Sequence, residues 1–110
     1  MKNEYGVLLD RNGYAPSVVI AYKDDACFLC DRMGDLVRHE IFHGPYRTKS
    51  KALGCWVLLC PDCHMRLHAN ADLDRQLKQI GQRLAMAWYD WTVDEFRERF
   101  GKNFEEEEQI

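Results

Sequence analysis

Four cysteines in two closely spaced pairs are the residues of this sequence whose types and spacing point most directly to chemistry. Cys27 and Cys30 form one CxxC pair, and Cys60 and Cys63 form a second pair after 29 intervening residues. Each CxxC turn lets two sulfurs converge on one metal, and two such turns complete the tetrahedral thiolate shell that zinc prefers. We therefore predict a closed, structural Zn²⁺ site. An iron–sulfur site, a redox pair and a disulfide scaffold are the alternatives.

The histidines form a second candidate group. His64 directly follows the second CxxC pair and His68 comes four residues later, so a helix that begins here puts both imidazoles on one face. His39 lies on a predicted strand that pairs with the strand leading into the same CxxC pair. A hairpin followed by a helix brings these three side chains together, which predicts a second, open metal site. The alternative is that they are surface histidines or neighbours of the zinc. His43, in a predicted loop, is the weaker candidate.

Hydrophobic patterning predicts the elements that must position these side chains. We expect an α+β fold with an N-terminal β-hairpin, a central hairpin and C-terminal helices. Thr92 and Glu95 have the spacing of a capping box, which predicts the start of the last helix. The predicted elements are a hairpin or a pair of short strands over 5–22, a strand over 36–42, a loop or short helix over 44–54, a strand over 56–59, a helix beginning near residue 60, a helix over 72–91 and a helix from 92 to 100.

Length and charge indicate one small domain. The chain has 110 residues, and we assign 1–104 to a single zinc domain and 105–110 to a flexible acidic tail. The net charge is −3, but without the glutamates at 105–108 it is +1, so a local basic face is compatible with the composition. No apolar run is long enough to span a membrane, and the N-terminus does not resemble a signal peptide. We therefore expect a cytoplasmic protein with reduced thiols.

Two segments resemble the HNH endonuclease family. LCPDCHMRLH (59–68) resembles the C-terminal half of the HNH motif, and RHEIFHG (38–44) resembles its first strand. With RTKSKALGCWV (47–57), they resemble small HNH-type proteins of phages and prophages, some of which are described as recombinase-dependent nucleases. The resemblance implies a ββα-metal finger and metal-dependent cleavage of DNA. It also implies that His39 is the general base, and that His64 and His68 bind a catalytic Mg²⁺, Mn²⁺, Ni²⁺ or Zn²⁺ ion.

Two departures from the HNH pattern leave alternatives open. Many HNH proteins have a metal-ligating acid or histidine just before the base, where this chain has Arg38. A register shifted by one residue makes His39 a ligand and Glu40 the neighbouring base. The central asparagine of the motif is missing, and Cys55 stands near its place. The leading hypothesis is an HNH-type DNA endonuclease. The alternative is a weak or inactive zinc-stabilised module that binds DNA or a protein partner.

Cations and aromatic residues suggest the partners. Local positive charge can hold a DNA backbone even when the whole chain is acidic. Besides DNA, the resemblance suggests a recombinase or another phage or host protein as a partner. We expect Trp88, Tyr89 and Trp91 to pack in the core, or else to form a protein-binding surface. The predicted DNA-binding cations are Arg38, Arg47, Lys49, Lys51 and Arg66.

Overall fold

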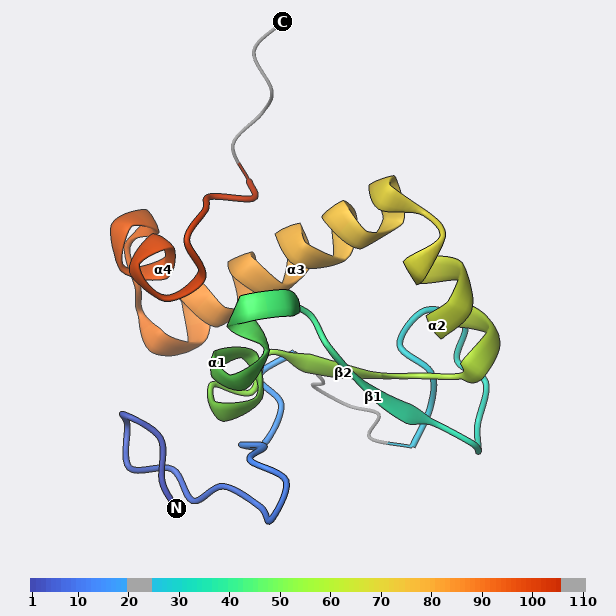
Figure 1. The fold of residues 1–110 in the computed structure, drawn as a ribbon, viewed down its shortest axis with the longest axis horizontal. Coiled ribbons are helices and arrows are strands. Elements are labelled where there is room, and N and C mark those ends of the chain that lie inside the picture. The colour runs from blue at the N-terminus through green and yellow to red at the C-terminus, as the bar shows by residue number, and fades with distance from the viewer. Residues whose placement is uncertain (20–24, 106–110) are drawn as a thin grey trace, which may run out of the picture.

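Two short strands form the only sheet among the residues that the computed structural model describes, which are 1–19 and 25–105 (Figure 1). Strands β1 (Val37–Glu40) and β2 (Trp56–Leu59) pair antiparallel, with His39 opposite Val57. Side chains alternate between the two faces of a strand, and Val57 and Leu59 are the buried members of β2. The central hairpin is thus confirmed, although its first strand is shorter than the predicted 36–42.

The helices agree with the sequence patterns. The predicted capping box is present, because the Thr92 hydroxyl accepts from the backbone N–H of Glu95 and the Glu95 carboxylate accepts from the N–H of Thr92. The segment 44–54, predicted as a loop or short helix, is mainly helical. The helical elements are a 3₁₀ turn η1 (Gly44–Tyr46), α1 (Arg47–Ala52), α2 (Pro61–His68), α3 (Ala71–Tyr89) and α4 (Val93–Phe100).

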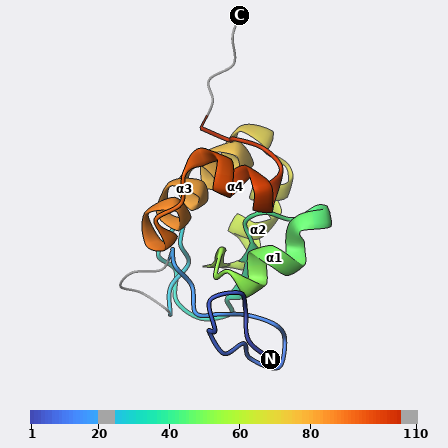
Figure 2. The ribbon, with the colours of Figure 1, turned by 90° about the vertical axis from the view of Figure 1, so that its left-hand side faces the viewer.

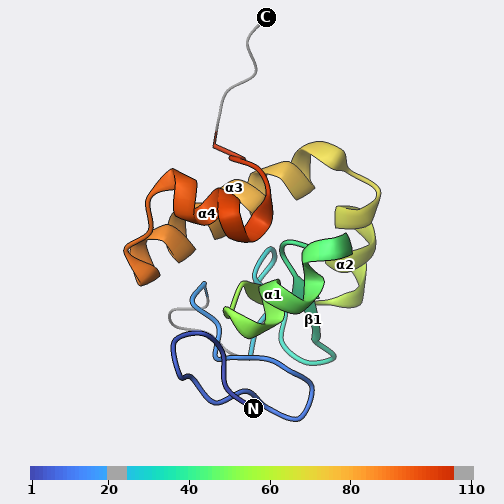
Figure 3. The same cartoon turned by 60° about the vertical axis from the view of Figure 1, so that its left-hand side comes forward.

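The core lies between the hairpin and the two C-terminal helices. Helices α3 and α4 cover one side of the strands, and the N-terminal segment and α1 lie toward the other (Figures 2 and 3). Phe42 packs against Phe96 and Phe100, with ring centroids 5.3 and 4.3 Å away. A Cβ atom at Gly81 would lie 3.0 Å from Ile41, so a glycine lets α3 approach the end of β1 closely.

The predicted N-terminal β-hairpin is not present in the part of the chain that the structure describes. The turn itself forms, because the Asp10 carboxylate accepts from the backbone N–H groups of Asn12 and Tyr14. Beyond the turn, however, the N–H of Ala15 donates to the carbonyl of Lys51 and that of Val18 to the carbonyl of Gly54. This segment therefore bonds to the end of α1 and the turn after it. Residues 20–22 of the predicted second strand lie outside the described residues.

The aromatic residues near the end of α3 divide between the core and the surface. Trp91 is buried, and its ring packs against Phe96. Trp88 is 68% exposed, so the prediction that it packs in the core is wrong. A helix of 3.6 residues per turn has room for only one buried stripe, and Trp88 lies outside it. None of the described helices combines the length and apolar character needed to cross a membrane.

Candidate metal centres

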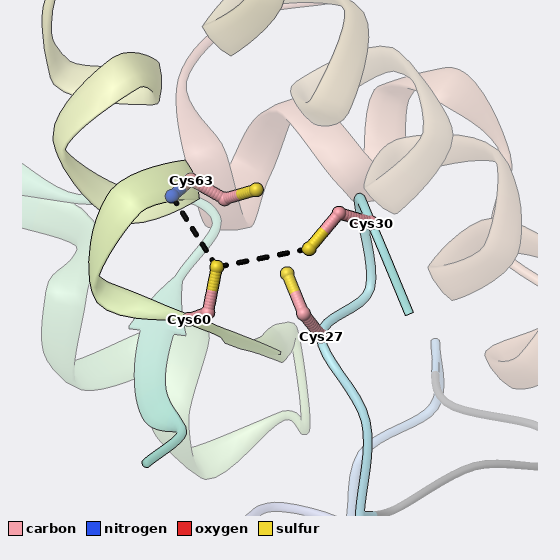
Figure 4. A group of neighbouring side chains, drawn as sticks. All are labelled: Cys27, Cys30, Cys60 and Cys63. Atoms are coloured by element: carbon pink, nitrogen blue, oxygen red, sulfur yellow. Dashed lines mark hydrogen bonds between the residues drawn. The ribbon is translucent and has the colours of Figure 1, made fainter. Parts of the chain in front are cut away.

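The four predicted cysteines come together at one end of the hairpin. Cys27 and Cys30 lie on a tight loop, in which the N–H of Cys27 donates to the carbonyl of Arg32. The N–H of Phe28 also donates to the carbonyl of Leu58, which fastens this loop to β2. The other two cysteines belong to α2, where Cys60 is the N-cap. The four side chains point toward one another from these two segments (Figure 4).

The spacing of the sulfurs fits a tetrahedral metal, and none of the cysteines forms a disulfide in this structure. The four Sγ atoms all lie within 4.8 Å of one another, and those of Cys30 and Cys60 are 3.7 Å apart. A tetrahedral zinc ion with Zn–S bonds of about 2.3 Å separates its sulfurs by about 3.8 Å. A disulfide would need about 2.05 Å, and all five cysteines are free. The cluster can therefore hold a structural metal such as zinc, as the spacing predicted.

Hydrogen bonds and burial shift the pKa values of the cysteine thiols in opposite directions. The backbone N–H of Cys63 points at the Cys60 sulfur, 3.5 Å away, and lowers the pKa of that thiol to about 7. Burial raises the pKa of Cys63 to about 12, although the Arg66 guanidinium, 3.2 Å from its sulfur, opposes this. Metal binding must therefore displace protons from the cluster. The fifth cysteine, Cys55, is buried and outside the cluster, and burial raises the pKa of its thiol.

A second group of possible ligands is formed by His39, His64 and His68. One nitrogen from each imidazole lies within 4.8 Å of the others. The Nε2 atoms of His64 and His68, one helical turn apart on α2, are 3.1 Å apart. Two imidazoles on a tetrahedral ion, with Zn–N bonds of about 2.0–2.1 Å, would have nitrogens about 3.3 Å apart. The hairpin and α2 thus bring together the three histidines that the spacing predicted.

His39 is the most buried member of this group. Its side chain is 4% exposed, and Nε2 is the one buried side-chain nitrogen or oxygen without a hydrogen-bond partner among the residues described. An unpaired buried polar atom costs about 1–3 kcal/mol, so it calls for a partner. Burial, together with the charges of His64 and His43, lowers the pKa of His39 to about 4. The ring is therefore neutral at pH 7, which is the state that ligates a metal.

Arg38 and Glu40 project from the other face of β1. The Arg38 guanidinium lies over the rings of Tyr14 and Trp56 and pairs with Asp10 at 2.7 Å. The Glu40 carboxylate accepts from the Tyr14 hydroxyl at 2.5 Å and pairs with Arg47 at 3.2 Å. Only 11% of the Glu40 side chain is exposed. Both residues next to His39 thus already have partners on the face opposite to the histidines.

The five predicted DNA-binding cations do not form one surface around the histidines. Arg66 contacts the cysteine cluster through Cys63, and Arg38 and Arg47 make the contacts just described. Lys51 lies over the Tyr14 ring, with its Nζ 4.9 Å from the centroid. Lys49 is exposed on α1. Three of the five cations therefore contact Tyr14 or Glu40, on the side of the hairpin where the N-terminal segment lies.

Two features near the histidines were not predicted from the sequence. His43, placed in a loop, pairs through Nε2 with the Asp74 carboxylate at 3.2 Å, and its ring centroid is 6.0 Å from that of His39. Asp74 belongs to α3 and also pairs with Lys78. Because these partners lie 31 residues apart in the chain, no local spacing joins them. Tyr14 was predicted only as part of the 5–22 segment, and nothing in its neighbourhood indicated its bond to Glu40.

Comparisons with known proteins give this chain no relative. No protein-family model matches it, and neither the curated proteins nor the solved structures contain a match. The chemistry of the two clusters and of their surroundings is therefore what bears on function.

Proposed function

We propose that this protein is a divalent-metal-dependent DNA endonuclease of the HNH type. The observation that carries the proposal is the convergence of three imidazoles, one of which belongs to the buried His39, whose Nε2 has no hydrogen-bond partner. A three-ligand set on a two-stranded sheet and a helix leaves a coordination position open for a substrate. The cysteine cluster is closed by its four ligands, so its proposed role is to hold structural zinc and to support α2.

The three histidine ligands also favour some metal ions over others. Three neutral imidazoles suit Zn²⁺ or Ni²⁺, whereas Mg²⁺ and Mn²⁺ prefer carboxylate and water oxygens. Of the four candidate ions, we therefore favour Zn²⁺ and Ni²⁺ at the histidines. A metal bound there supplies a Lewis acid for the phosphate and its leaving oxygen.

Two assignments of the histidine on β1 are compatible with the HNH pattern. One imidazole nitrogen of His39 lies with those of His64 and His68, and the buried Nε2 of His39 has no hydrogen-bond partner, which favours a ligand role for all three. Glu40 is then the proposed general base, the group that accepts a proton from the attacking water. Its side chain leaves the other face of β1, but its carboxylate is near enough to His64 to act electrostatically on that imidazole. The Tyr14 hydroxyl and the Arg47 guanidinium would hold the Glu40 carboxylate in position.

One observation favours a second candidate function, a module that binds a metal and nucleic acid without cutting. The Glu40 carboxylate is nearly buried, and both of its oxygens have partners, so an attacking water would have to compete with Tyr14 and Arg47. In addition, the chain has no asparagine where the motif places one. Such a module would bind the metal and the DNA but would lack a working general base.

A plasmid-nicking assay separates the two functions. Supercoiled plasmid would be incubated with the zinc-loaded protein and Zn²⁺, Ni²⁺, Mn²⁺ or Mg²⁺, with EDTA as the negative control. We expect nicking with Zn²⁺ or Ni²⁺, its loss in His64→Ala, and a decrease of about 10²–10⁴-fold in Glu40→Gln. His43→Ala is the matched control, because it removes a nearby histidine outside the ligand set. Nicking that survives His64→Ala would refute the site, and no nicking with any metal would favour the binding module.

A further inference from the structure

A surface pocket lies on the face of the hairpin opposite to the histidines. Its wall is formed by the exposed Leu8 and by Tyr14, Arg38 and Trp56, and we call it the Tyr14 pocket. Its volume is about 330 Å³, near the lower end of the roughly 300–1,000 Å³ typical of small-molecule sites. The pocket therefore has room for one planar group rather than for a folded chain.

The chemistry of the Tyr14 pocket suits an aromatic ring with polar edges. The Tyr14 and Trp56 rings meet edge to face, with centroids 5.6 Å apart. Arg38 lies over both rings, 4.3 and 4.9 Å from their centroids, and Asp10 fixes its guanidinium, yet 37% of the Arg38 side chain is exposed. A guanidinium held in this way is a stacking platform and a hydrogen-bond donor for a nucleobase.

Positive charge next to the pocket suits the phosphate backbone to which a nucleobase is attached. A second cavity of about 540 Å³ shares Leu9 and Asp10 with the Tyr14 pocket and is lined by Arg11 and Lys51. Lys51 also contacts the Tyr14 ring, so its charge lies beside both cavities. Aromatic rings beside a cationic track are the usual means of binding single-stranded nucleic acid without sequence readout. This local charge contrasts with the net charge of −3 for the whole chain.

We propose that the Tyr14 pocket binds an unpaired nucleobase, so that the nucleic acid bound by this protein is single-stranded or locally unpaired at this point. Bases inside a duplex are stacked on both faces and cannot enter such a pocket. The inference rests on the proposed function for the choice of nucleic acid as the ligand. The Tyr14 pocket would add a contact to a nucleobase at a place distinct from both metal clusters. The substrate class is thereby narrowed to nucleic acid with an unpaired base.

The test compares two fluorescent single strands of equal length, one of thymidines and one of abasic deoxyribose phosphates. Both carry the same charge, so phosphate contacts alone bind them equally. We expect the zinc-loaded protein to bind the thymidine strand at least about fivefold more tightly in anisotropy titrations at constant salt, since stacking contributes about 1–3 kcal/mol per base. Equal affinity for the two strands would overturn the proposal.

Two variants locate the contact. Tyr14→Leu removes the ring and should bring the ratio of the two affinities close to one. Trp88→Leu removes an exposed aromatic residue on α3 and should leave the ratio unchanged. A preference for bases that persists in Tyr14→Leu would overturn the assignment to this pocket. Because the titration requires no cleavage, failure of the nicking assay would count against the proposed function alone.

Discussion

Replacing His39 by leucine should have opposite effects on stability with and without a metal at the histidines. Leucine is similar in size to histidine, but it has no polar atom to bury. In the wild type, the His39 Nε2 is buried without a hydrogen-bond partner, which costs about 1–3 kcal/mol. With the histidine cluster empty, His39→Leu should therefore raise the free energy of unfolding by about 1–3 kcal/mol at pH 7.

Added metal should make the wild type more stable than His39→Leu. A ligand that binds only the folded state stabilises it by about 2.7 kcal/mol at 100 times its Kd and by about 4.1 kcal/mol at 1,000 times. The wild type gains this term when Zn²⁺ or Ni²⁺ fills the histidines, whereas the variant lacks one of the three ligands. At saturation the wild type should therefore be the more stable protein, although it is the less stable one without added metal.

Thermal unfolding followed by circular dichroism measures both effects. The protein would carry zinc at its cysteines, and melts would be recorded with and without added metal. For a chain of about this size, each kcal/mol shifts Tm by about 4 °C or more. His43→Leu serves as the control, because this variant keeps the three ligands and should still respond to metal. A wild type that shows no metal response, together with a less stable His39→Leu without metal, would refute the reasoning.

Two further predictions concern metal content and pH. At saturation the wild type should bind two metal ions per chain by elemental analysis. His64→Ala should keep its fold and one ion, whereas Cys60→Ser should lose folding as well as zinc; a folded Cys60→Ser protein with two ions would contradict this. Between pH 6.5 and 4 the unfolded chain binds a proton at His39 that the folded chain does not, since the folded pKa is about 4. The free energy of unfolding of the wild type should therefore fall as the pH is lowered through this window, by up to about 3 kcal/mol relative to His39→Leu in matched melts. If the stabilities of the two proteins instead changed with pH in parallel, a His39 pKa of about 4 would be excluded.

The residues at both clusters could be predicted because their spacing is local. A CxxC turn brings two sulfurs together without help from the rest of the chain, and histidines four apart on a helix share a face. The capping box at Thr92 is equally local. His39 required one further step, the pairing of two strands that flank a basic segment. Each of these predictions depended on short-range geometry or on a single hairpin.

The parts that could not be predicted depend on contacts between distant segments. Residues 15–18 bond to 51–54 rather than to the preceding strand, and the turn at Asp10 gives no sign of this. Arg38 was expected near the histidines because it adjoins His39 in the sequence. Neighbouring residues on a strand point to opposite faces, however, and Arg38 contacts Tyr14 instead. Periodicity places a side chain on a face but does not tell what covers that face.

Helix α2 and its N-cap carry candidate ligands of both clusters, so we expect an order of metal loading. Cys60 is the N-cap of this helix, Cys63 lies in its first turn, and His64 directly follows Cys63. An isolated helix of eight residues is not stable in water, so α2 needs support from the first metal before its histidines are in position. In a zinc titration of the stripped chain, we therefore expect folding to be complete at one equivalent and the histidines to fill only beyond it. When zinc is scarce, it is then spread singly over many chains rather than in pairs over a few.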